Sequence, residues 1–467
     1  MANILFIVVV AAIVLGPLIV LHEFGHFIVA KLFGVKVLTF SVGFGKRLWG
    51  FKRGDTDYRL SLIPLGGYVK MAGENLDEQI TGSPDEFSSK PRWQRLCVAF
   101  AGPVMNILIA LVIPAVLAMV HFEYPAYRTH QPAISAVEPG SGAETAGILP
   151  GDVVLKIDGK DTQTWLDVED IVSLNPEQNL IITIRRGSGT KDISVRTSYS
   201  MFDQDKIGES GLEPDWGPNA ALIASEVTSG APADEAGLKV GDKLMKVNGR
   251  PLHPSGVGRR EVVRTIRGSQ GKPVILTVER VGEIIEITAI PRIIGDGLKI
   301  GLAPAVANAE MISTRLGLGG AVAYSLGENG RIIRLTKDLI GQVFVGKRSA
   351  RDTLAGPIQI ATFAGEAAKQ GPVTVLHLMG VLSLNLGVFN LLPIPVLDGG
   401  LIFMILIDAA LGVFGFSLAL RVKEKMMQVG FVLLMLLMAF VIFNDVSKRF
   451  PSKSSTTTQA QPQGSGK

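Results

Sequence analysis

The stretch VLHEFGHFIVA, residues 20–30, carries three side chains that can do metal chemistry inside an apolar segment. Helix positions four apart share a face, so His22 and His26 converge on one point, and Glu23 projects about 100° away, near enough to reach a ligand of that point. A catalytic zinc keeps three protein ligands and an open position for water, and Glu23 can take a proton from that water. The spacing therefore predicts a zinc site with Glu23 as general base.

The apolar context favours a metal site over a chance pair of surface histidines. In a soluble protein, such a five-residue match usually means two exposed imidazoles. Ionisable side chains at membrane depth cost at least ~2.5–3.5 kcal/mol each, and they mark functional sites by default. We therefore expect His22 and His26 to bind a metal.

A third protein ligand has to come from another part of the chain. The candidates near other apolar segments are Asp398, Asp408, His377, Glu366 and His121. Asp398 is the strongest, because the prolines and glycines of NLLPIPVLDGG break a regular helix and allow a side chain to turn inward. We expect Asp408 at a helix end or interface, and His377 as a hydrogen-bonded helix residue.

Composition indicates a membrane protein. Of the 467 residues, 47% are hydrophobic and 19% charged, and the mean hydropathy is +0.34. The net charge of +4 is too small to indicate a nucleic-acid partner. The single cysteine, Cys97, excludes a disulfide framework and a zinc site built from cysteines.

Four apolar segments have the length and composition of transmembrane helices. They cover residues 4–30, 98–120, 375–397 and 426–443. A cleavable signal peptide at the N-terminus would need a basic start and a small-residue cleavage site, which MANILFIVVV lacks. The run Leu401–Leu420 contains Asp408, and it is either an extension of the third helix or an interfacial helix rather than a fifth span.

Basic residues orient these spans. Lysines and arginines gather in the connection after the first span, at Lys31, Lys36, Lys46, Arg47, Lys90, Arg92 and Arg95. The positive-inside bias places this connection in the cytoplasm, so residues 121–372 are expected outside it. The tail, 448–467, has the composition of a disordered segment.

The external segment contains an internal repeat. SGAETAGILPGDVVLKIDG and SGAPADEAGLKVGDKLMKVNG align with a two-residue insertion, placing Gly151-Asp152 over Gly241-Asp242 and Asp158-Gly159 over Asn248-Gly249. We predict two modules, 122–200 and 215–305, each with a short helix, a Gly-Asp turn and a hairpin signal. Each resembles a circularly permuted PDZ domain. That resemblance implies binding of peptide ligands at a sheet edge, and a spacer or steric filter is the open alternative.

Several motifs together, in this order, resemble the site-2 protease family of intramembrane zinc metalloproteases. They are LHEFGHFIVAKLFGV, FSVGFGKRLW, SLIPLGGYVKMAGE, FAGPVMN, the two modules and NLGVFNLLPIPVLDGG. The resemblance implies zinc ligands at His22, His26 and Asp398, with Glu23 as base, and a substrate-handling role for Asn385 and Asn390. It also implies a bacterial inner membrane, periplasmic PDZ domains, and single-span membrane proteins as substrates, such as anti-sigma factors or remnant signal peptides.

The region from about residue 38 to 72 has the aromatic and β-branched pattern of strands. The family has a re-entrant sheet beside the active site here, whose edge can pair with an unwound substrate, and the alternative is a surface hairpin. Asn385 and Asn390 offer amides to the substrate, or hold helices together. The AGP break at Ala101–Pro103 and Asn106 indicate close packing on the first helix, and residues 306–372 read as amphipathic connecting helices.

The expected architecture is thus a polytopic α-helical membrane protein with about four transmembrane helices, a re-entrant β element and two PDZ-like β/α domains outside the cytoplasm. Catalytic residues divide between an N-terminal region, 1–121, and a C-terminal region, 373–447. Two other functional classes stay open: a PDZ adaptor whose metal is structural or absent, and a metal carrier. A general base beside two metal ligands is of little use to either, so Glu23 discriminates against both.

Overall fold

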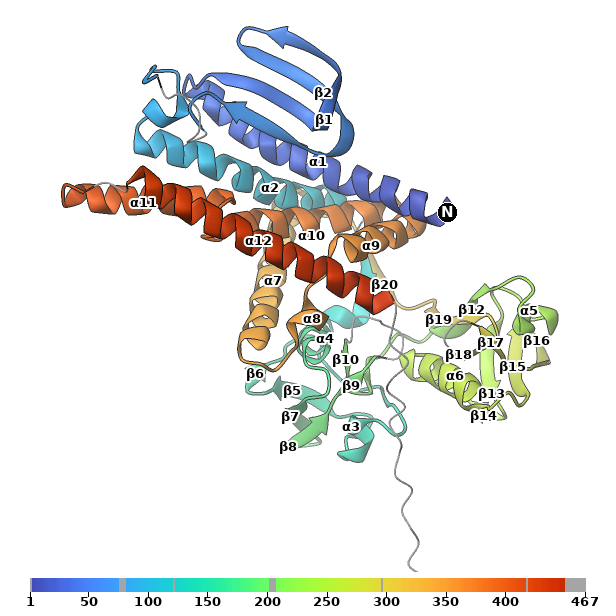
Figure 1. Cartoon of the computed structure of the whole chain (residues 1–467). Coiled ribbons are helices and arrows are strands. Elements are labelled where there is room, and N and C mark those ends of the chain that lie inside the picture. Colours follow the sequence, from blue (N-terminus) through green and yellow to red (C-terminus); the bar gives the residue numbers. More distant parts are fainter. Residues whose placement is uncertain are drawn as a thin grey trace, which may run out of the picture. The chain divides into compact units, whose positions relative to one another are not determined.

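A computed structural model describes residues 2–74, 81–120, 122–200, 207–294, 297–416 and 419–449. The chain divides into two compact units (Figure 1). The first combines Met1–Val120 with Leu316–Lys467, and the second is His121–Arg315. Of the features expected from the sequence, His121 and residues 450–467 of the tail lie outside the described residues.

The first unit is built on helices. Its longer helices are α1 (Ala2–Leu32), α2 (Arg92–Val120), α7 (Leu318–Phe344), α9 (Pro357–Gln370), α10 (Pro372–Asn390), α11 (Asp398–Val413) and α12 (Leu420–Arg449), with the short α8 (Ala350–Thr353) and η1 (Phe87–Ser89). Within the described residues, four segments are long and apolar enough to cross a membrane: Val9–Leu32, Arg92–Val120, Pro372–Asn390 and Arg421–Ser447. Four transmembrane helices were expected, and these four segments overlap the predicted ranges.

The third apolar segment differs from the prediction. It was expected to run to Leu397, but α10 ends at Asn390 and residues 391–397 are not helical. Two prolines in this stretch, Pro393 and Pro395, cannot supply the backbone N–H that a helix interior needs. Because α11 starts anew at Asp398, the run Leu401–Leu420 is not an extension of the third helix. With 16 residues, α11 is also shorter than the about 20 that a span requires.

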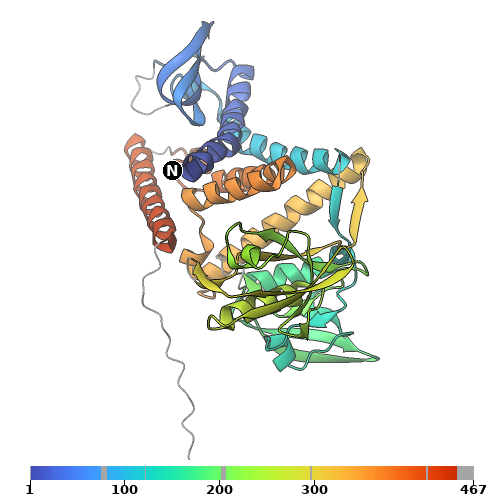
Figure 2. The same ribbon diagram turned by 90° about the vertical axis from the view of Figure 1, so that its right-hand side faces the viewer.

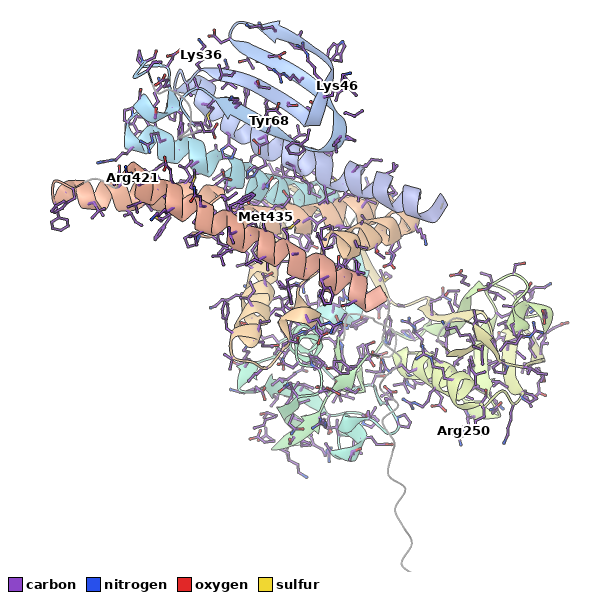
Figure 3. All side chains as sticks on the ribbon, in the orientation of Figure 1. Lys36, Lys46, Tyr68, Arg250, Arg421 and Met435 are labelled. Carbon is purple, nitrogen blue, oxygen red and sulfur yellow. The ribbon has the colours of Figure 1, made fainter. Side chains whose placement is uncertain are left out.

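The helix α12 is packed least among the four. Only 6% of its apolar window is buried, and its large apolar side chains stay exposed, such as Phe431, Leu433 and Leu436 (Figure 3, around Met435). In Figure 2 it stands to one side of the other helices of this unit. Polar contacts hold it at both ends: Lys423 pairs with Asp408 at 3.6 Å, and Asp445 accepts hydrogen bonds from the N–H groups of Gly356, Ile358 and Gln359 at 3.0–3.2 Å.

The connecting region 306–372 also differs from the expectation of helices throughout. It begins with strand residues, and only α7, α8 and α9 follow as helices. The long α7 packs against the middle of α2, because Ser325 Oγ donates to the Leu111 carbonyl at 2.6 Å and Asn329 Nδ2 to the Ala110 carbonyl at 3.0 Å. Both side chains are buried. A helix that lay only along the membrane surface would not bury them there.

A β-hairpin of two long strands, β1 (Val37–Arg53) and β2 (Thr56–Met71), lies against α1 (Figure 1). The strands curl, so residues 39–42 of β1 have partners both in residues 57–60 and in residues 67–70 of β2. The segment 67–71 is therefore at an edge of this sheet. Large side chains on the hairpin are exposed, with Trp49 65% and Leu48 59% accessible.

The second unit contains the remaining strands and short helices. Its strands are β3 (Phe122–Pro125), β4 (Ala136–Val137), β5 (Val153–Ile157), β6 (Lys160–Asp161), β7 (Asn179–Arg186), β8 (Gly189–Arg196), β9 (Ser198–Tyr199), β10 (Gly208–Glu209), β11 (Leu212–Glu213), β12 (Ala221–Val227), β13 (Lys243–Val247), β14 (Arg250–Pro251), β15 (Val274–Arg280), β16 (Glu283–Ala289), β17 (Arg292–Ile294), β18 (Gly297–Lys299), β19 (Leu302–Ala307) and β20 (Met311–Thr314). Its helices are η2 (Ala126–Thr129), α3 (Gly142–Thr145), α4 (Trp165–Leu174), α5 (Pro232–Glu235) and α6 (Gly256–Gly268). Its two larger sheets have the orders β6-β5-β7-β8 and β16-β15-β13-β12-β19, with β14 pairing with β13 in the latter, and β9 with β10, β4 with β11, β17 with β18 and β3 with β20 form two-stranded sheets.

The internal repeat of the sequence has a matching repeat of contacts. Asp152 binds Arg186 at 2.6 and 2.7 Å, and Asp242 binds Arg280 at 2.6 and 2.7 Å. The Nη2 group of each arginine also donates a hydrogen bond to a glycine carbonyl at 2.8 Å, that of Gly147 in the first module and that of Gly237 in the second. The hairpin turn of the first module has Asp158 at a φ of 49°, and that of the second has Asn248 at a φ of 48°. Asp and Asn tolerate such positive φ values. The Asp–Arg pair and the hairpin turn thus recur in both modules.

The boundary between the modules falls later than the sequence indicated. The first module was expected to end at 200, but β11 pairs with β4 and Trp216 packs against the first hydrophobic core. A cluster of ion pairs around the buried Arg260 joins the two modules, which we call the intermodule cluster: Glu138, Glu209 and Glu213 with Arg260 and Arg264. The repeat alignment could not show this, because it reports which positions of the two copies correspond and not which residues of one copy contact the other.

Candidate metal centre and active site

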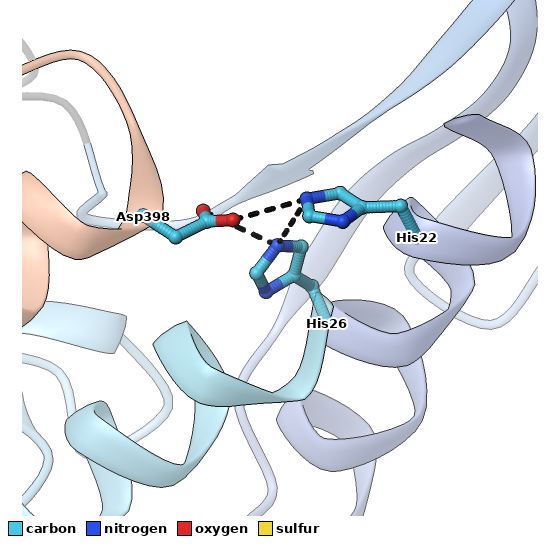
Figure 4. Close-up of side chains that lie close together, drawn as sticks. All are labelled: His22, His26 and Asp398. Atoms are coloured by element: carbon cyan, nitrogen blue, oxygen red, sulfur yellow. Dashed lines mark hydrogen bonds and ion pairs between the residues drawn. The ribbon is translucent and has the colours of Figure 1, made fainter. Parts of the chain in front are cut away.

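The helix α1 carries the two histidines one turn apart, as the four-residue spacing predicts (Figure 4). His22 is 7% and His26 8% exposed. Their Nε2 atoms lie 3.3 Å apart. The other ring nitrogen of His26 donates to the carbonyl of Val98 on α2, at 2.7 Å, so the proton of that ring is on Nδ1 and Nε2 is free to bind a metal.

The start of α11 brings Asp398 to the same point. Asp398 Oδ2 lies 3.0 Å from His22 Nε2, and Oδ1 lies 3.3 Å from His26 Nε2. The preceding segment reverses through Val396, which has a φ of 89° although it is β-branched. Such a conformation is strained for valine, and strained residues gather at functional sites. The broken helix expected around PIPVLDGG is therefore what turns this carboxylate toward the histidines.

The three donors fit a zinc ion. Zinc binds imidazole nitrogen and carboxylate oxygen at about 2.0–2.2 Å in tetrahedral geometry, which separates neighbouring ligand atoms by about 3.3–3.5 Å. Here the two Nε2 atoms are 3.3 Å apart, and each lies near a different oxygen of Asp398, His22 at 3.0 Å from Oδ2 and His26 at 3.3 Å from Oδ1. Among the residues that the structure describes, His22, His26 and Asp398 are the group of three or more ligand side chains that converges in this way. Two imidazoles and one carboxylate leave a fourth position for water, as catalytic zinc sites do.

The glutamate between the histidines points to the β-hairpin. Glu23 Oε2 accepts a hydrogen bond from the backbone N–H of Val69, in the edge segment of β2, at 3.1 Å. Glu23 also lines a cavity of about 220 Å³ together with His22, Asp398 and Asn390. The candidate base, the ligands and the strand edge thus meet at one place.

The two predicted asparagines are placed differently. Asn390 lines the cavity, and its amide nitrogen is 3.5 Å from His22 Nε2. Asn385 instead donates to the carbonyl of Val381 in its own helix, at 3.0 Å, and is not among the residues that line the cavity. The structure thus places Asn390 in the wall of the cavity and Asn385 outside that wall.

The alternative third ligands lie elsewhere. Asp408 pairs with Arg92 at 3.5 Å and with Lys423 at 3.6 Å, at an interface between helices as expected. His377 on α10 and Glu366 on α9 are exposed. None of these three belongs to the group that His22, His26 and Asp398 form.

Close approach of α2 to the site was expected from the AGP break, and two glycines allow it. A Cβ built on Gly25 would lie 2.9 Å from the carbonyl carbon of Ala101. A Cβ built on Gly102 would lie 2.7 Å from His22 Nε2. Both are nearer than real Cβ atoms come, so α2 reaches the ligands only because these positions lack side chains.

Sequence reasoning missed the role of two groups on α2. It took Asn106 for a packing residue, yet its side-chain amide faces His22 Nδ1 at 3.2 Å. It gave no role to Val98, whose carbonyl holds His26. A backbone carbonyl has no sequence signal. Asn106 had one, because it is a polar residue within an apolar span and one turn after Gly102.

Comparisons with known proteins identify the family of this chain. The model of Peptidase family M50 matches residues 10–437. The regulator of sigma-E protease RseP of Salmonella typhimurium is 34% identical over 96% of this chain and 100% of its own length, and that of Escherichia coli K12 is 32% identical over 93% and 97%. A Vibrio cholerae relative, whose name places it among the zinc metalloproteases, is 33% identical over 96% and 100%. This chain is therefore a member of peptidase family M50.

Proposed function

We propose that this chain is an intramembrane zinc metalloprotease, an endopeptidase that hydrolyses peptide bonds within single-span membrane proteins. One observation carries the proposal: His22 and His26, which flank Glu23 on a helix able to cross a membrane, converge with Asp398 of α11 at zinc-ligand spacing. The names of the relatives support the choice of zinc and of proteolysis.

The residues divide the chemistry between them. His22, His26 and Asp398 would hold the zinc ion, which supplies Lewis acidity to polarise the scissile carbonyl and to acidify water. Glu23 takes the proton from the attacking water and passes it to the leaving amine nitrogen. The hydrogen bond from Val69 holds the Glu23 carboxylate at the strand edge, next to the ligands. Asn390 is placed to donate a hydrogen bond to the substrate backbone.

The substrate must be unwound, because a continuous helix hides its carbonyl groups in hydrogen bonds. We assign the edge segment of β2 to this task. Residues 67–71 pair on one side with β1 and lie next to Glu23 on α1, so an extended substrate added at this edge runs past the ligands. Asn385 lies five residues before Asn390 on α10, and its contact with substrate stays a prediction.

The cellular setting also belongs to the proposal. It comprises a bacterial inner membrane crossed four times, the two modules as periplasmic PDZ domains, and substrates already trimmed on the outside. Anti-sigma factors and remnant signal peptides are such substrates. The E. coli and Salmonella relatives are named as regulators of sigma-E, which supports the first of these classes.

The direct test uses purified protein in liposomes with a labelled single-span substrate. We expect the wild type to cleave it and Glu23→Gln to cleave about 10²–10⁴-fold more slowly, which is what a general base contributes. Glu366→Gln is the matched control, because Glu366 is an exposed glutamate of the same unit. Equal cleavage by wild type and Glu23→Gln would refute the protease, and binding of partners without cleavage would favour the adaptor.

The filter role of the modules has its own test. Because Met311 pairs with Pro125 across the β3–β20 ladder, a short glycine-serine linker can replace residues 126–310 without separating the ends. We expect this variant to cleave full-length and trimmed substrates alike, whereas the wild type prefers the trimmed one. If the linker variant still prefers the trimmed substrate, the modules do not act as the filter.

A groove variant separates peptide capture from size exclusion. In the second module, α6, β18 and β19 line a groove of about 330 Å³, and Val263 projects into it. If the filter captures peptides, Val263→Glu loses the preference for trimmed substrate. If it excludes by size, Val263→Glu keeps that preference and only the linker variant loses it.

A further inference from the structure

The two histidines differ in what holds their second ring nitrogen. His26 Nδ1 donates to a backbone carbonyl, that of Val98, at 2.7 Å. His22 Nδ1 instead faces the side chain of Asn106 on α2, at 3.2 Å. When Nε2 binds a metal, the proton of a neutral imidazole is on Nδ1, so each Nδ1 requires an acceptor. Val98 supplies one for His26, and the question is what supplies it for His22.

The Asn106 amide can do so in one of its two orientations. With its nitrogen toward His22 Nδ1, two donors face each other, and Asn106 Oδ1 is buried without a hydrogen-bond partner among the described residues. A half-turn of the amide group places Oδ1 where it accepts the Nδ1–H proton of His22. Oxygen and nitrogen of an amide have nearly the same shape, so the hydrogen bonds decide between the orientations.

The setting of Asn106 favours a fixed role. Its side chain is 1% exposed, and its backbone carbonyl accepts a hydrogen bond from Ser383 Oγ on α10 at 2.8 Å. It therefore joins α1, α2 and α10 at the site. A buried amide that leaves an atom unpaired costs about 1–3 kcal/mol, so packing alone would favour an apolar residue here.

We propose that Asn106 is a positioning residue for the metal: it accepts the Nδ1–H of His22 and thereby fixes the ring in the tautomer whose Nε2 is free to bind zinc. This inference rests on the metal site proposed above. Asn106 does for His22 what the Val98 carbonyl does for His26. It acts through His22 and has no need to touch the substrate.

The test measures zinc affinity of the purified full-length chain by competition with a chromophoric chelator. Loss of an outer partner of a metal-binding histidine typically weakens metal binding about 10- to 100-fold, and we expect this for Asn106→Leu. Asn106→Asp keeps an acceptor oxygen, so its affinity should stay close to that of the wild type. Asn329→Leu is the matched control, because Asn329 is also buried against α2 but bonds the Ala110 carbonyl, and we expect no change in its affinity.

Cobalt replaces zinc as a spectroscopic probe of the same variants. We expect the visible absorption of Asn106→Leu to differ from that of the wild type, because His22 is free to turn, and that of Asn106→Asp to match the wild type. If Asn106 had a purely structural role, the spectra of both variants would match that of the wild type. If Asn106→Leu does not fold, Asn106→Asp decides, and a loss of zinc affinity in it beyond tenfold would overturn the inference.

The outcomes also separate this inference from the proposed function. If the wild type binds no zinc, the metal site itself is wrong. If the wild type binds zinc and Asn106→Leu binds it equally well, only the positioning role fails. If zinc affinity is unchanged but KM for the substrate rises in Asn106→Leu, Asn106 contacts the substrate and the positioning role is overturned.

Discussion

The intermodule cluster and the metal centre both bury carboxylates, and they compensate the charge in different ways. In the intermodule cluster, Glu138 and Glu213 meet the guanidinium group of Arg260, which is 9% exposed. At the metal centre, Asp398 contacts two imidazoles beside Glu23, and none of the described residues that line the cavity is a lysine or arginine. A cluster that contains its own cations is complete as a structural element, whereas the one without them is where we propose a bound cation.

The largest effect should follow from removing a ligand. We expect Asp398→Ala to lose zinc affinity by more than the about 10- to 100-fold of an outer partner, because it removes a donor atom itself. Asp408→Ala on the same helix is the control, since Asp408 is paired with Arg92 and Lys423. Zinc content of both variants after dialysis is the measurement. Equal zinc content in Asp398→Ala and Asp408→Ala would show that the cluster around Asp398 does not differ from the intermodule cluster by binding zinc.

Next in size is the loss of the cation from the intermodule cluster. Arg260→Ala leaves the buried Glu213 without a cation and Glu138 with Arg264 alone, which should reduce the stability of the second unit by about 3–5 kcal/mol and leave zinc affinity unchanged. Arg250→Ala is the control, because Arg250 is exposed (Figure 3) and lies 3.8 Å from Glu261, and a surface pair contributes about 0–1 kcal/mol. Hydrogen exchange of the full chain reports both. A similar small effect of the two variants would show that the cluster is not structural.

The smallest effect concerns the paired aspartates of the modules. Hydrogen bonds from Arg186 hold the pKa of Asp152 below its usual value, against the opposing effect of burial. A carboxyl whose pKa is lower in the folded state stabilises it above the unfolded pKa, about 3.9, and this contribution is lost as pH falls through the folded pKa. We expect stability of the second unit to fall below about pH 4, and less steeply in Asp152→Asn. Thermal unfolding at several pH values measures the slope, and parallel slopes would contradict the prediction.

Local spacing was enough to predict that two of the three proposed ligands converge. His22 and His26 lie on one helix, where a separation of four residues fixes their geometry. Asp398 is distant in sequence, and only the prolines and glycines around it indicated that its side chain could leave the helix pattern. The role of Glu23 could be predicted from its place between the histidines. Its hydrogen bond from Val69 could not, because that bond depends on how the hairpin lies against α1.

What the sequence missed depends on the relative placement of elements. The face that α2 turns to α1 decides whether Asn106 meets His22 or packs elsewhere, and hydropathy does not encode that rotation. The apolar pattern continues through Leu397 although α10 ends at Asn390, so hydropathy placed the end of the third helix too late. In the second unit, the strand β11 pairs with β4 of the first module, which is distant in sequence, and periodicity within each repeat could not reveal that pairing.

The most direct test of this account is anomalous diffraction at the zinc edge from crystals of the full chain. We predict one peak between α1 and the start of α11, at about 2.0–2.2 Å from His22 Nε2, His26 Nε2 and an oxygen of Asp398. A proteolytically active protein without a peak there, or with the ion bound by other side chains, would contradict the account.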